Sequence, residues 1–194
     1  MRPTLVEKTI YFVTDNVHKL REVELIGRQM GFDIQPLRGL KVEIQSESIE
    51  EVSRRSALLA YLIVGKPILV EDAGLFIEVL NGFPGPYSNY VYKTIGINGI
   101  LKLMKGVEDR RACFKSASTL IYEPYVITEI GEICGWLAEE PRGFQGFGFD
   151  PIFIPEGSTK TFGEMSVEEK NVFSHRARSV SNALAKLKSL MTQT

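Results

Sequence analysis

In the first forty residues a strand-like apolar run, a segment with the apolar spacing of a helix and a second strand-like run follow one another. Few fold classes have this order of elements. Residues 9–14 form a short β-rich run. The next segment places apolar side chains at steps of three or four residues, namely Val17, Leu20, Val23, Ile26 and Met30. These periods predict a strand, a turn and an amphipathic helix. Gly31 ends the helix and residues 32–37 give the next strand, so the opening is β-α-β and indicates an α/β protein.

The following segment continues this alternation. Residues 48–64 are expected to be helical, with Ser48 as the N-cap and acidic Glu50 and Glu51 in the first turn, where they suit the helix dipole. Residues 67–71 are expected to form a buried strand and residues 75–80 a further strand. A loop rich in Gly and Pro, residues 81–86, ends this second strand.

Two long strand-like runs, residues 110–122 and 125–137, surround Glu123-Pro124. They predict an antiparallel hairpin that forms a second lobe, so that the central sheet is mixed and flanked by helices. Cys113 and Cys134 each lie about ten residues from the turn and are expected to face one another, although a one-residue shift of the register would part them. Behind them, an apolar stripe that follows Ser174 predicts a C-terminal helix docked on the core.

Composition limits the classes of partner. The 194 residues, 44% of them hydrophobic, suffice for one domain over residues 1–194. With 23 Lys and Arg against 24 Asp and Glu, no basic excess is present to hold a polyanion, so no nucleic-acid partner is expected. The longest apolar run, residues 58–64, is too short for a membrane span, and the N-terminus lacks a signal-peptide core, which predicts a cytoplasmic protein. The two cysteines have no metal-ligand spacing, and free thiols are expected.

Thr14, Asn16 and Lys19 stand between the first strand and its helix. At such a position backbone N–H groups and the helix dipole attract phosphate. The glycines of a Walker loop are missing. The alternative is an Asn-containing turn with Thr14 as a cap, and His18 is interpreted as an exposed turn residue.

Acidic side chains give the second candidate group. Glu71 and Asp72 are expected where a buried strand ends, so at least one carboxylate should face a cleft. Glu43 and Glu47 add acids between a strand and a helix. Such carboxylates can hold Mg²⁺, which keeps waters for phosphate oxygens. The alternatives are a solvated strand end and surface glutamates.

A third group lies in the C-terminal third of the chain. Phe144, Phe147 and Phe149 are separated by glycines, which suits either a pocket for a base or core anchors on a bent loop. Asp150 follows them. Lys170, His175 and Arg176 add nitrogen donors, with a solvated helix start as the alternative interpretation.

Read together, these motifs resemble the inosine triphosphate pyrophosphatase family. The matching segments occur in the family's order over nearly the whole chain. They are Thr14-x-Asn16-x-x-Lys19, Glu71-Asp72-x-Gly74-Leu75, Gly82-x-Pro84-Gly85-x-Tyr87-Ser88, Phe147-Gly148-Phe149-Asp150-Pro151, and Glu169-Lys170 with His175-Arg176. The resemblance implies an elongated fold of two lobes with a central nucleotide cleft. It also implies a homodimer that hydrolyses ITP, dITP and XTP to the monophosphate and pyrophosphate with Mg²⁺.

The resemblance also implies roles for individual residues. Asp72 and Glu71 would be catalytic, with Glu43 and Asp72 as the metal ligands. Substrate contacts would come from the remaining matched positions, which are Thr14, Asn16, Lys19, Ala73, Phe147, Gly148, Phe149, Asp150, Lys170, His175 and Arg176. Asp15, His18 and Ala73 depart from the family's pattern, and Arg54 or Arg55 would have to replace a helix lysine that many members carry.

Two other functions fit the same pocket. One is a non-catalytic nucleotide sensor, which would not need the gathered acids. The other is a pyrophosphatase that acts on pyrimidine or modified pyrimidine nucleotides. A substrate panel with pyrophosphate detection separates all three.

Overall fold

Residues 8–42 and 44–192, which the computed structural model describes, form one seven-stranded sheet. The strands are β1 (Thr9–Val13), β2 (Asp33–Leu37), β3 (Ile68–Ile77), β4 (Pro84–Gly85), β5 (Arg111–Tyr122), β6 (Tyr125–Leu137) and β7 (Phe153–Pro155). Their order is β2-β1-β3-β5-β6-β7, and β4 pairs with β3. β1 is parallel to β2 and β3, whereas the remaining pairs are antiparallel. The prediction of a mixed α/β sheet is confirmed.

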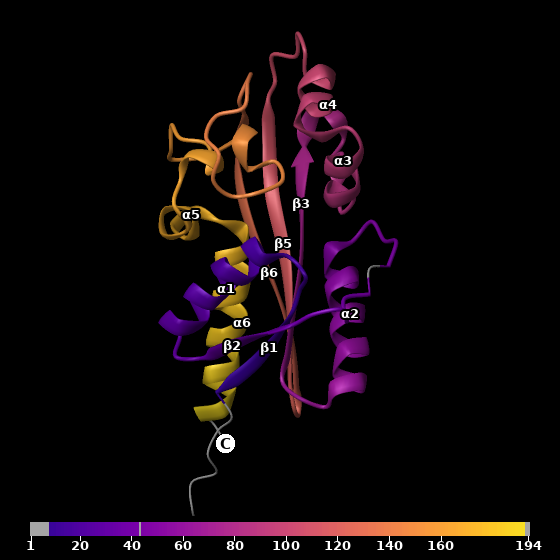
Figure 1. The fold of residues 1–194 in the computed structure, drawn as a ribbon, viewed down its shortest axis with the longest axis vertical. Coiled ribbons are helices and arrows are strands. Elements are labelled where there is room, and N and C mark those ends of the chain that lie inside the picture. The colour runs from indigo at the N-terminus through magenta and orange to yellow at the C-terminus, as the bar shows by residue number, and fades with distance from the viewer. Residues whose placement is uncertain (1–7, 43, 193–194) are drawn as a thin grey trace, which may run out of the picture.

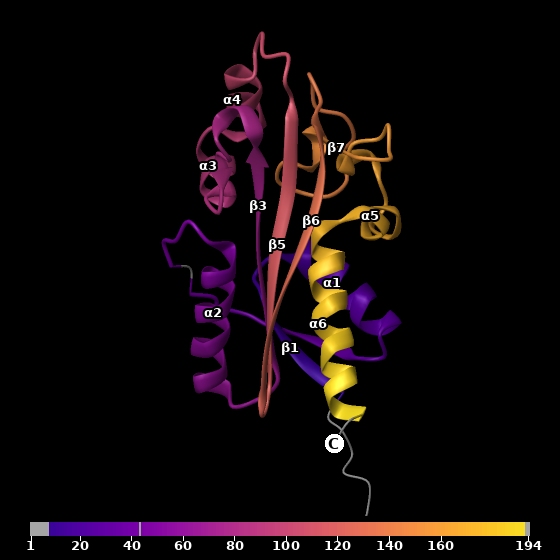
Figure 2. The same ribbon diagram turned by 180° about the vertical axis from the view of Figure 1, so that it is seen from behind.

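Helices cover both faces of this sheet. They are α1 (Val17–Gln29), α2 (Ile49–Val64), α3 (Ser88–Thr94), α4 (Gly96–Leu103), α5 (Val167–Phe173) and α6 (His175–Thr192). Figures 1 and 2 show an elongated molecule with α2, α3 and α4 on one side of the long strands and α1, α5 and α6 on the other. No helix within the described ranges is both long enough and apolar enough to cross a bilayer.

The helix boundaries follow the capping residues of the sequence. Ser48 Oγ accepts the Glu51 N–H at the start of α2, at 3.2 Å. Ser174 Oγ accepts the Ala177 N–H at the start of α6, at 3.0 Å. Both predicted caps are confirmed, because each serine satisfies a backbone donor that the first helical turn leaves unpaired.

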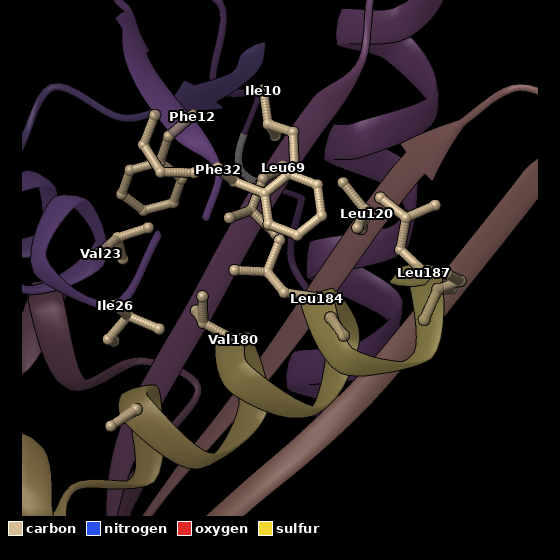
Figure 3. Close-up of a cluster of buried hydrophobic side chains, with 14 residues drawn as sticks. Ile10, Phe12, Val23, Ile26, Phe32, Leu69, Leu120, Val180, Leu184 and Leu187 are labelled. Atoms are coloured by element: carbon tan, nitrogen blue, oxygen red, sulfur yellow. The ribbon is translucent and has the colours of Figure 1, made fainter. Parts of the chain in front are cut away.

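Separate hydrophobic clusters occupy the two ends of β3. At the α6 end, Leu69 packs with Phe12, Leu184 and other buried side chains from β1, α1 and α6 (Figure 3). At the opposite end, Leu75 belongs to a cluster that includes Phe153. The polar residues Glu71 and Asp72 lie between these clusters, so the middle of β3 is where charged side chains enter the interior.

Two predictions about β3 are wrong. The expected strands 67–71 and 75–80 are one continuous strand, Ile68–Ile77, and Glu78–Leu80 is a 3₁₀ helix. Glu71 and Asp72 therefore lie mid-strand, not at a strand end. The strand continues because β5 pairs with it over its full length, and Gly74 allows the close approach of Gly85, whose carbonyl oxygen would lie 2.1 Å from a Cβ at position 74.

The predicted hairpin is confirmed, with Tyr122 opposite Tyr125. It does not form a separate lobe, because β5 also pairs with β3 along ten residues, and β5 and β6 run along the whole molecule in Figure 1. The predicted register is also confirmed, since Cys113 pairs with Cys134. The expectation of free thiols is wrong: the two sulfurs form a disulfide. The turn at Glu123-Pro124 sets the register that makes this bond possible.

Candidate active site

The middle of β3 is open along one edge. On the side away from β5, β3 pairs with β1 at Ile68 and Leu69 and with β4 at Leu75 and Phe76. Residues 70–74 have no strand partner on that side within the part of the chain that the structure describes. An unpaired strand edge presents backbone donors and acceptors, so this interruption of the sheet offers a place for a ligand.

The turn that follows β1 lies beside this opening. Because Phe12 pairs with Leu69 in parallel register, Thr14 falls level with Glu71. Thr14 Oγ1 accepts the Asn16 N–H at 3.1 Å, and Asn16 Oδ1 accepts the N–H groups of His18 and Lys19 at 2.9 and 3.1 Å. Asn16, and not Thr14, is therefore the N-cap of α1. This cap aims the side chain of Lys19 at β3.

Lys19 and Lys41 hold the two carboxylates of β3. Lys19 Nζ lies 2.8 Å from Glu71 Oε2, and Lys41 Nζ lies 2.9 Å from Asp72 Oδ1. Neighbouring strand residues point to opposite faces, so Glu71 enters the side covered by α6 and Asp72 enters the side covered by α2. The side chain of Glu71 is fully buried, whereas that of Asp72 keeps 10% exposure. Ala73, the next predicted contact, is held in the ladder opposite Ser116.

Six ionisable side chains from five elements meet behind Glu71 and form what we call the charge cluster. Its members are Lys19 and Glu22 of α1, Glu71 of β3, Asp150 of the 3₁₀ helix Asp150–Ile152, Lys170 of α5 and Arg176 of α6. Arg176 bridges Glu71 and Glu22, with 3.1 Å from its Nε to Glu71 Oε1. Lys170 Nζ bridges Glu22 Oε1 at 2.8 Å and Asp150 Oδ2 at 2.6 Å. Three acids and three bases balance the formal charge, as buried ions require.

The charges inside the cluster shift the pKa values of its own side chains. Burial alone would raise the pKa of Glu22, but Arg176 and Lys170 outweigh it and lower that pKa to about 2. Burial also opposes the charge of Glu71, yet Arg176 and Lys19 hold its pKa well below the ordinary range. Burial lowers the pKa of Lys19, which Glu71 partly restores. Glu71 therefore stays a carboxylate that orients cations and is a poor proton acceptor.

The glycine-rich loop is fastened to this cluster. Asp150 Oδ2 accepts the Phe147 N–H at 2.8 Å and also receives Lys170. Burial raises the pKa of Asp150, and Lys170 opposes that effect. Gly146 has a φ of +73°, and a Cβ there would lie 2.2 Å from Asp150 Oδ2. The loop thus needs glycine where the chain passes the carboxylate, and Phe147 is held in a fixed place.

The ring of Phe147 contacts charged and aromatic groups. Lys170 Nζ and the Arg176 guanidinium carbon lie 4.9 and 5.3 Å from its centroid. His18 stacks on it, with 5.5 Å between the ring centroids and an interplanar angle of 20°. His18 is exposed, as predicted, but it lies in the first turn of α1 and not in a free turn. A cavity of about 230 Å³ opens beside His18, Gly146 and Lys170.

The other predicted residues of this group occupy different environments. Phe149 is a core anchor whose ring meets Tyr92 edge to face, and Phe144 is 96% exposed. His175 is buried and stacks on Phe114 at 4.7 Å. Burial first, and then the charge of Arg176, lower the pKa of His175 well below 6.5, so its ring is neutral. The solvated helix start expected as an alternative is wrong, because Lys170, His175 and Arg176 are each 2% exposed.

Sequence reasoning missed three residues. Glu22 joins Lys170 to Arg176, Lys41 pairs with Asp72, and His18 covers Phe147. Only Glu22 carried a sequence signal, since an acid interrupts the apolar face of α1 next to Val23. Long-range contacts between separate elements brought in the other two.

Within the residues that it describes, the structure does not place two of the predicted acids or the predicted replacement cation at Asp72. Glu43, the second predicted metal ligand, lies outside the described residues, and Glu47 is exposed. Arg55, a proposed replacement for the family's helix lysine, pairs with Glu51 on the surface of α2. The cation that reaches Asp72 is instead Lys41, two positions before Glu43.

Comparisons with known proteins match nearly the whole chain. A model of the Ham1 family matches residues 10–187. The chain is 50% identical over 171 residues to a dITP/XTP pyrophosphatase of Hyperthermus butylicus, covering 88% of this chain and 90% of that protein. It is 52% identical over 176 residues to a dITP/XTP pyrophosphatase of Ignicoccus hospitalis, covering 90% and 94%.

Solved structures give the same result. The Ham1 protein of Staphylococcus aureus superposes with a TM-score of 0.78 at 25% identity, over 93% of this chain and 98% of that one. A HAM1 protein of Coxiella burnetii gives 0.77 at 28% identity, over 96% and 99%. Fold, order of motifs and sequence identity agree across nearly the whole length. The chain therefore belongs to the Ham1 family.

Proposed function

We propose that this protein is a nucleoside-triphosphate pyrophosphatase that hydrolyses the non-standard purine nucleotides dITP, XTP and ITP to the monophosphate and pyrophosphate. The observation that carries the proposal is the open edge of β3, where Lys19 and Lys41 meet adjacent carboxylates beside the first turn of α1. A triphosphate needs such cations, and hydrolysis needs a carboxylate that can orient water. The curated relatives named dITP/XTP pyrophosphatase support the same substrate class.

The phosphates and the base would lie at opposite ends of the charge cluster. Lys19 at one end would bind the triphosphate, because an ammonium is a strong point-charge donor to phosphate oxygens. Thr14 and Asn16 would shape the turn around it. Phe147 at the other end would stack on the purine in the place that the His18 ring occupies, and Gly148 next to it has open space where a Cβ would lie. Glu22, Lys170 and Asp150 would keep both ends at a fixed separation.

Asp72 is suited to a metal ion. Its carboxylate is nearly buried, and a buried carboxylate needs a cation beside it, a place that Lys41 takes in this structure. Carboxylate oxygens are the ligands that Mg²⁺ prefers. Asp72, with Glu43 outside the described residues, would hold Mg²⁺. When bound, Mg²⁺ would supply charge that neutralises phosphate oxygens.

Asp72 is also the better candidate to orient the attacking water. Its side chain retains some exposure, whereas Glu71 is fully buried and bound to Lys19, Arg176 and Ser116. The role of Glu71 is then to position Lys19. In-line attack at the α-phosphorus would break the bond to the pyrophosphate oxygen, and Lys19 would stabilise the charge that develops on that oxygen.

A homodimer is proposed as the assembly. The outer surface of α2 exposes four neighbouring apolar side chains: Leu58, Leu59, Leu62 and Ile63, with 78% exposure at Leu62. Apolar groups gathered on a surface favour burial against another protein. Light scattering of the protein and of Leu62→Glu tests this, since the variant should become a monomer. The absence of membrane and nucleic-acid partners and the cytoplasmic location stay predictions.

The test of the function is a substrate panel with pyrophosphate detection. The panel compares dITP, XTP and ITP with ATP, GTP and dUTP. Asp72→Asn should abolish pyrophosphate release while a non-hydrolysable ITP analogue still binds, because the charge is lost but the pocket remains. Asp33→Asn, an exposed carboxylate of β2, is the matched control. Absence of pyrophosphate with every nucleotide would indicate a sensor, and preference for dUTP would refute the purine assignment.

A further inference from the structure

Lys41 approaches Asp72 from a loop that is distant in sequence. It lies between β2 and α2, and its ammonium is 2.9 Å from Asp72 Oδ1, with side-chain exposures of 13% for Lys41 and 10% for Asp72. Surface lysines elsewhere in the protein are more exposed, such as Lys186 at 57%. A lysine side chain loses much conformational freedom when it is held in this way. The contact is thus a positioned one and not a chance surface pair.

The backbone on both sides of Lys41 is fixed. Asp15 Oδ1 accepts the Gly39 N–H at 3.0 Å, which ties the loop to the turn after β1. Ser56, a buried residue of α2, donates its hydroxyl to the Val42 carbonyl. Asp15, a residue that departs from the family's pattern, therefore points at this loop. The two anchors direct Lys41 toward the open edge of β3.

Lys41 also lies near the second lysine of the site. Burial is the largest cause that lowers the pKa of Lys19, Glu71 raises it in part, and the charge of Lys41 lowers it further. Two ammonium groups close together favour a polyanion between them, because each repels the other until negative charge arrives. A triphosphate supplies that charge. Lys41 and Lys19 would then approach it from the two faces of β3.

We propose, resting on the function proposed above, that Lys41 is an exchangeable counter-ion of the active site. Without nucleotide, its ammonium neutralises Asp72 and opposes binding of a divalent cation there, since two cations on one carboxylate repel each other. When the metal and triphosphate bind, the ammonium leaves Asp72 and binds phosphate oxygens. Lys41 thereby makes metal binding depend on the nucleotide and serves as a triphosphate ligand.

Calorimetric titration with Mn²⁺ alone, and then with Mg²⁺ and a non-hydrolysable α,β-substituted ITP analogue, tests the proposal on the full-length protein. Lys41→Met keeps the length of the side chain but removes its charge. This variant should bind Mn²⁺ alone on the order of tenfold more tightly and the analogue on the order of tenfold more weakly, as expected for one charge-assisted hydrogen bond. Lys41→Gln should change both constants in the same directions.

Lys186→Met is the matched control, because Lys186 also pairs with a carboxylate, at 3.0 Å from Glu129. It should leave both constants unchanged. One outcome would overturn the role of Lys41 and leave the proposed function intact. In it, both Lys41 variants bind Mn²⁺ and the analogue with the affinities of the unmodified protein, while Asp72→Asn no longer binds Mn²⁺. If Asp72→Asn binds Mn²⁺ with unchanged affinity, both the metal site at Asp72 and the counter-ion role of Lys41 are overturned.

Discussion

Glu22 stabilises the protein through the charge cluster, and replacing it with glutamine measures by how much. The pKa of Glu22 falls from an ordinary 4.5 to about 2 because of Arg176 and Lys170. That difference of about 2.5 pKa units corresponds to about 3 kcal/mol of folding free energy. Breaking a buried ion pair by removing one partner costs a similar amount, about 3–5 kcal/mol. Glu22→Gln should therefore lower Tm by about 6–12 °C in a chain of this length.

The pH dependence gives a second signature of the same interaction. A carboxylate with a lowered pKa stabilises the fold above its unfolded pKa, and that contribution is lost as pH falls through the folded value. The stability difference between the unmodified protein and Glu22→Gln should be constant above pH 4.5. It should shrink as the pH falls from 4.5 to about 2. Urea denaturation at a series of pH values measures this difference directly.

A double variant separates charge balance from local packing. Glu22→Gln leaves the charge cluster with one excess positive charge, and adding Lys170→Met restores neutrality. The double variant should be more stable than the sum of the two single effects predicts, by at least about 1 kcal/mol. Glu24→Gln, on the same helix but outside the cluster, is the control. If Glu22→Gln lowers the free energy of unfolding by less than about 1 kcal/mol, and by no more than Glu24→Gln does, the reasoning is refuted.

Three further perturbations examine the site and the strand beneath it. Lys19→Ala should raise KM and lower kcat for dITP, because this cation acts in both the ground and transition states; unchanged steady-state constants would remove it from the site. Phe147→Ala should reduce kcat/KM for ITP and ATP by a similar factor, about 5–150-fold, since stacking hardly distinguishes purines; a loss confined to one nucleotide would contradict this. Gly74→Ala should lower Tm, because its Cβ would lie 2.1 Å from the Gly85 oxygen, and an unaltered melting curve would show that the backbone can move apart.

Local patterns in the sequence predicted most of the secondary structure. The apolar steps of α1 and α6 and the serine caps of α2 and α6 are short-range features, so the sequence suffices for them. The register of the long hairpin follows from counting outward from its turn, which placed Cys113 opposite Cys134. Whether those sulfurs form a bond depends on geometry that counting does not supply.

The continuity of β3 shows where local reasoning fails. Glu71, Asp72, Ala73 and Gly74 have the composition of a strand end, because charged and small residues are poor strand formers in isolation. In the folded protein β5 pairs with this stretch, and buried cations neutralise its carboxylates. Tertiary contacts outweigh the local preference. The strand that does end there is its neighbour β1, and this creates the opening beside Glu71.

The sequence by itself determined the fold class, the family and the identity of most candidate site residues, because periodicity, caps and ordered motifs are properties of the chain. Only the tertiary structure decided which of these residues meet. Glu71 and Asp72 are adjacent in sequence but enter opposite faces of the sheet, while Glu22 and Arg176, separated by more than 150 residues, form an ion pair. The physical reason is that buried charges are stable only with partners, and strands and helices distant along the chain supply those partners.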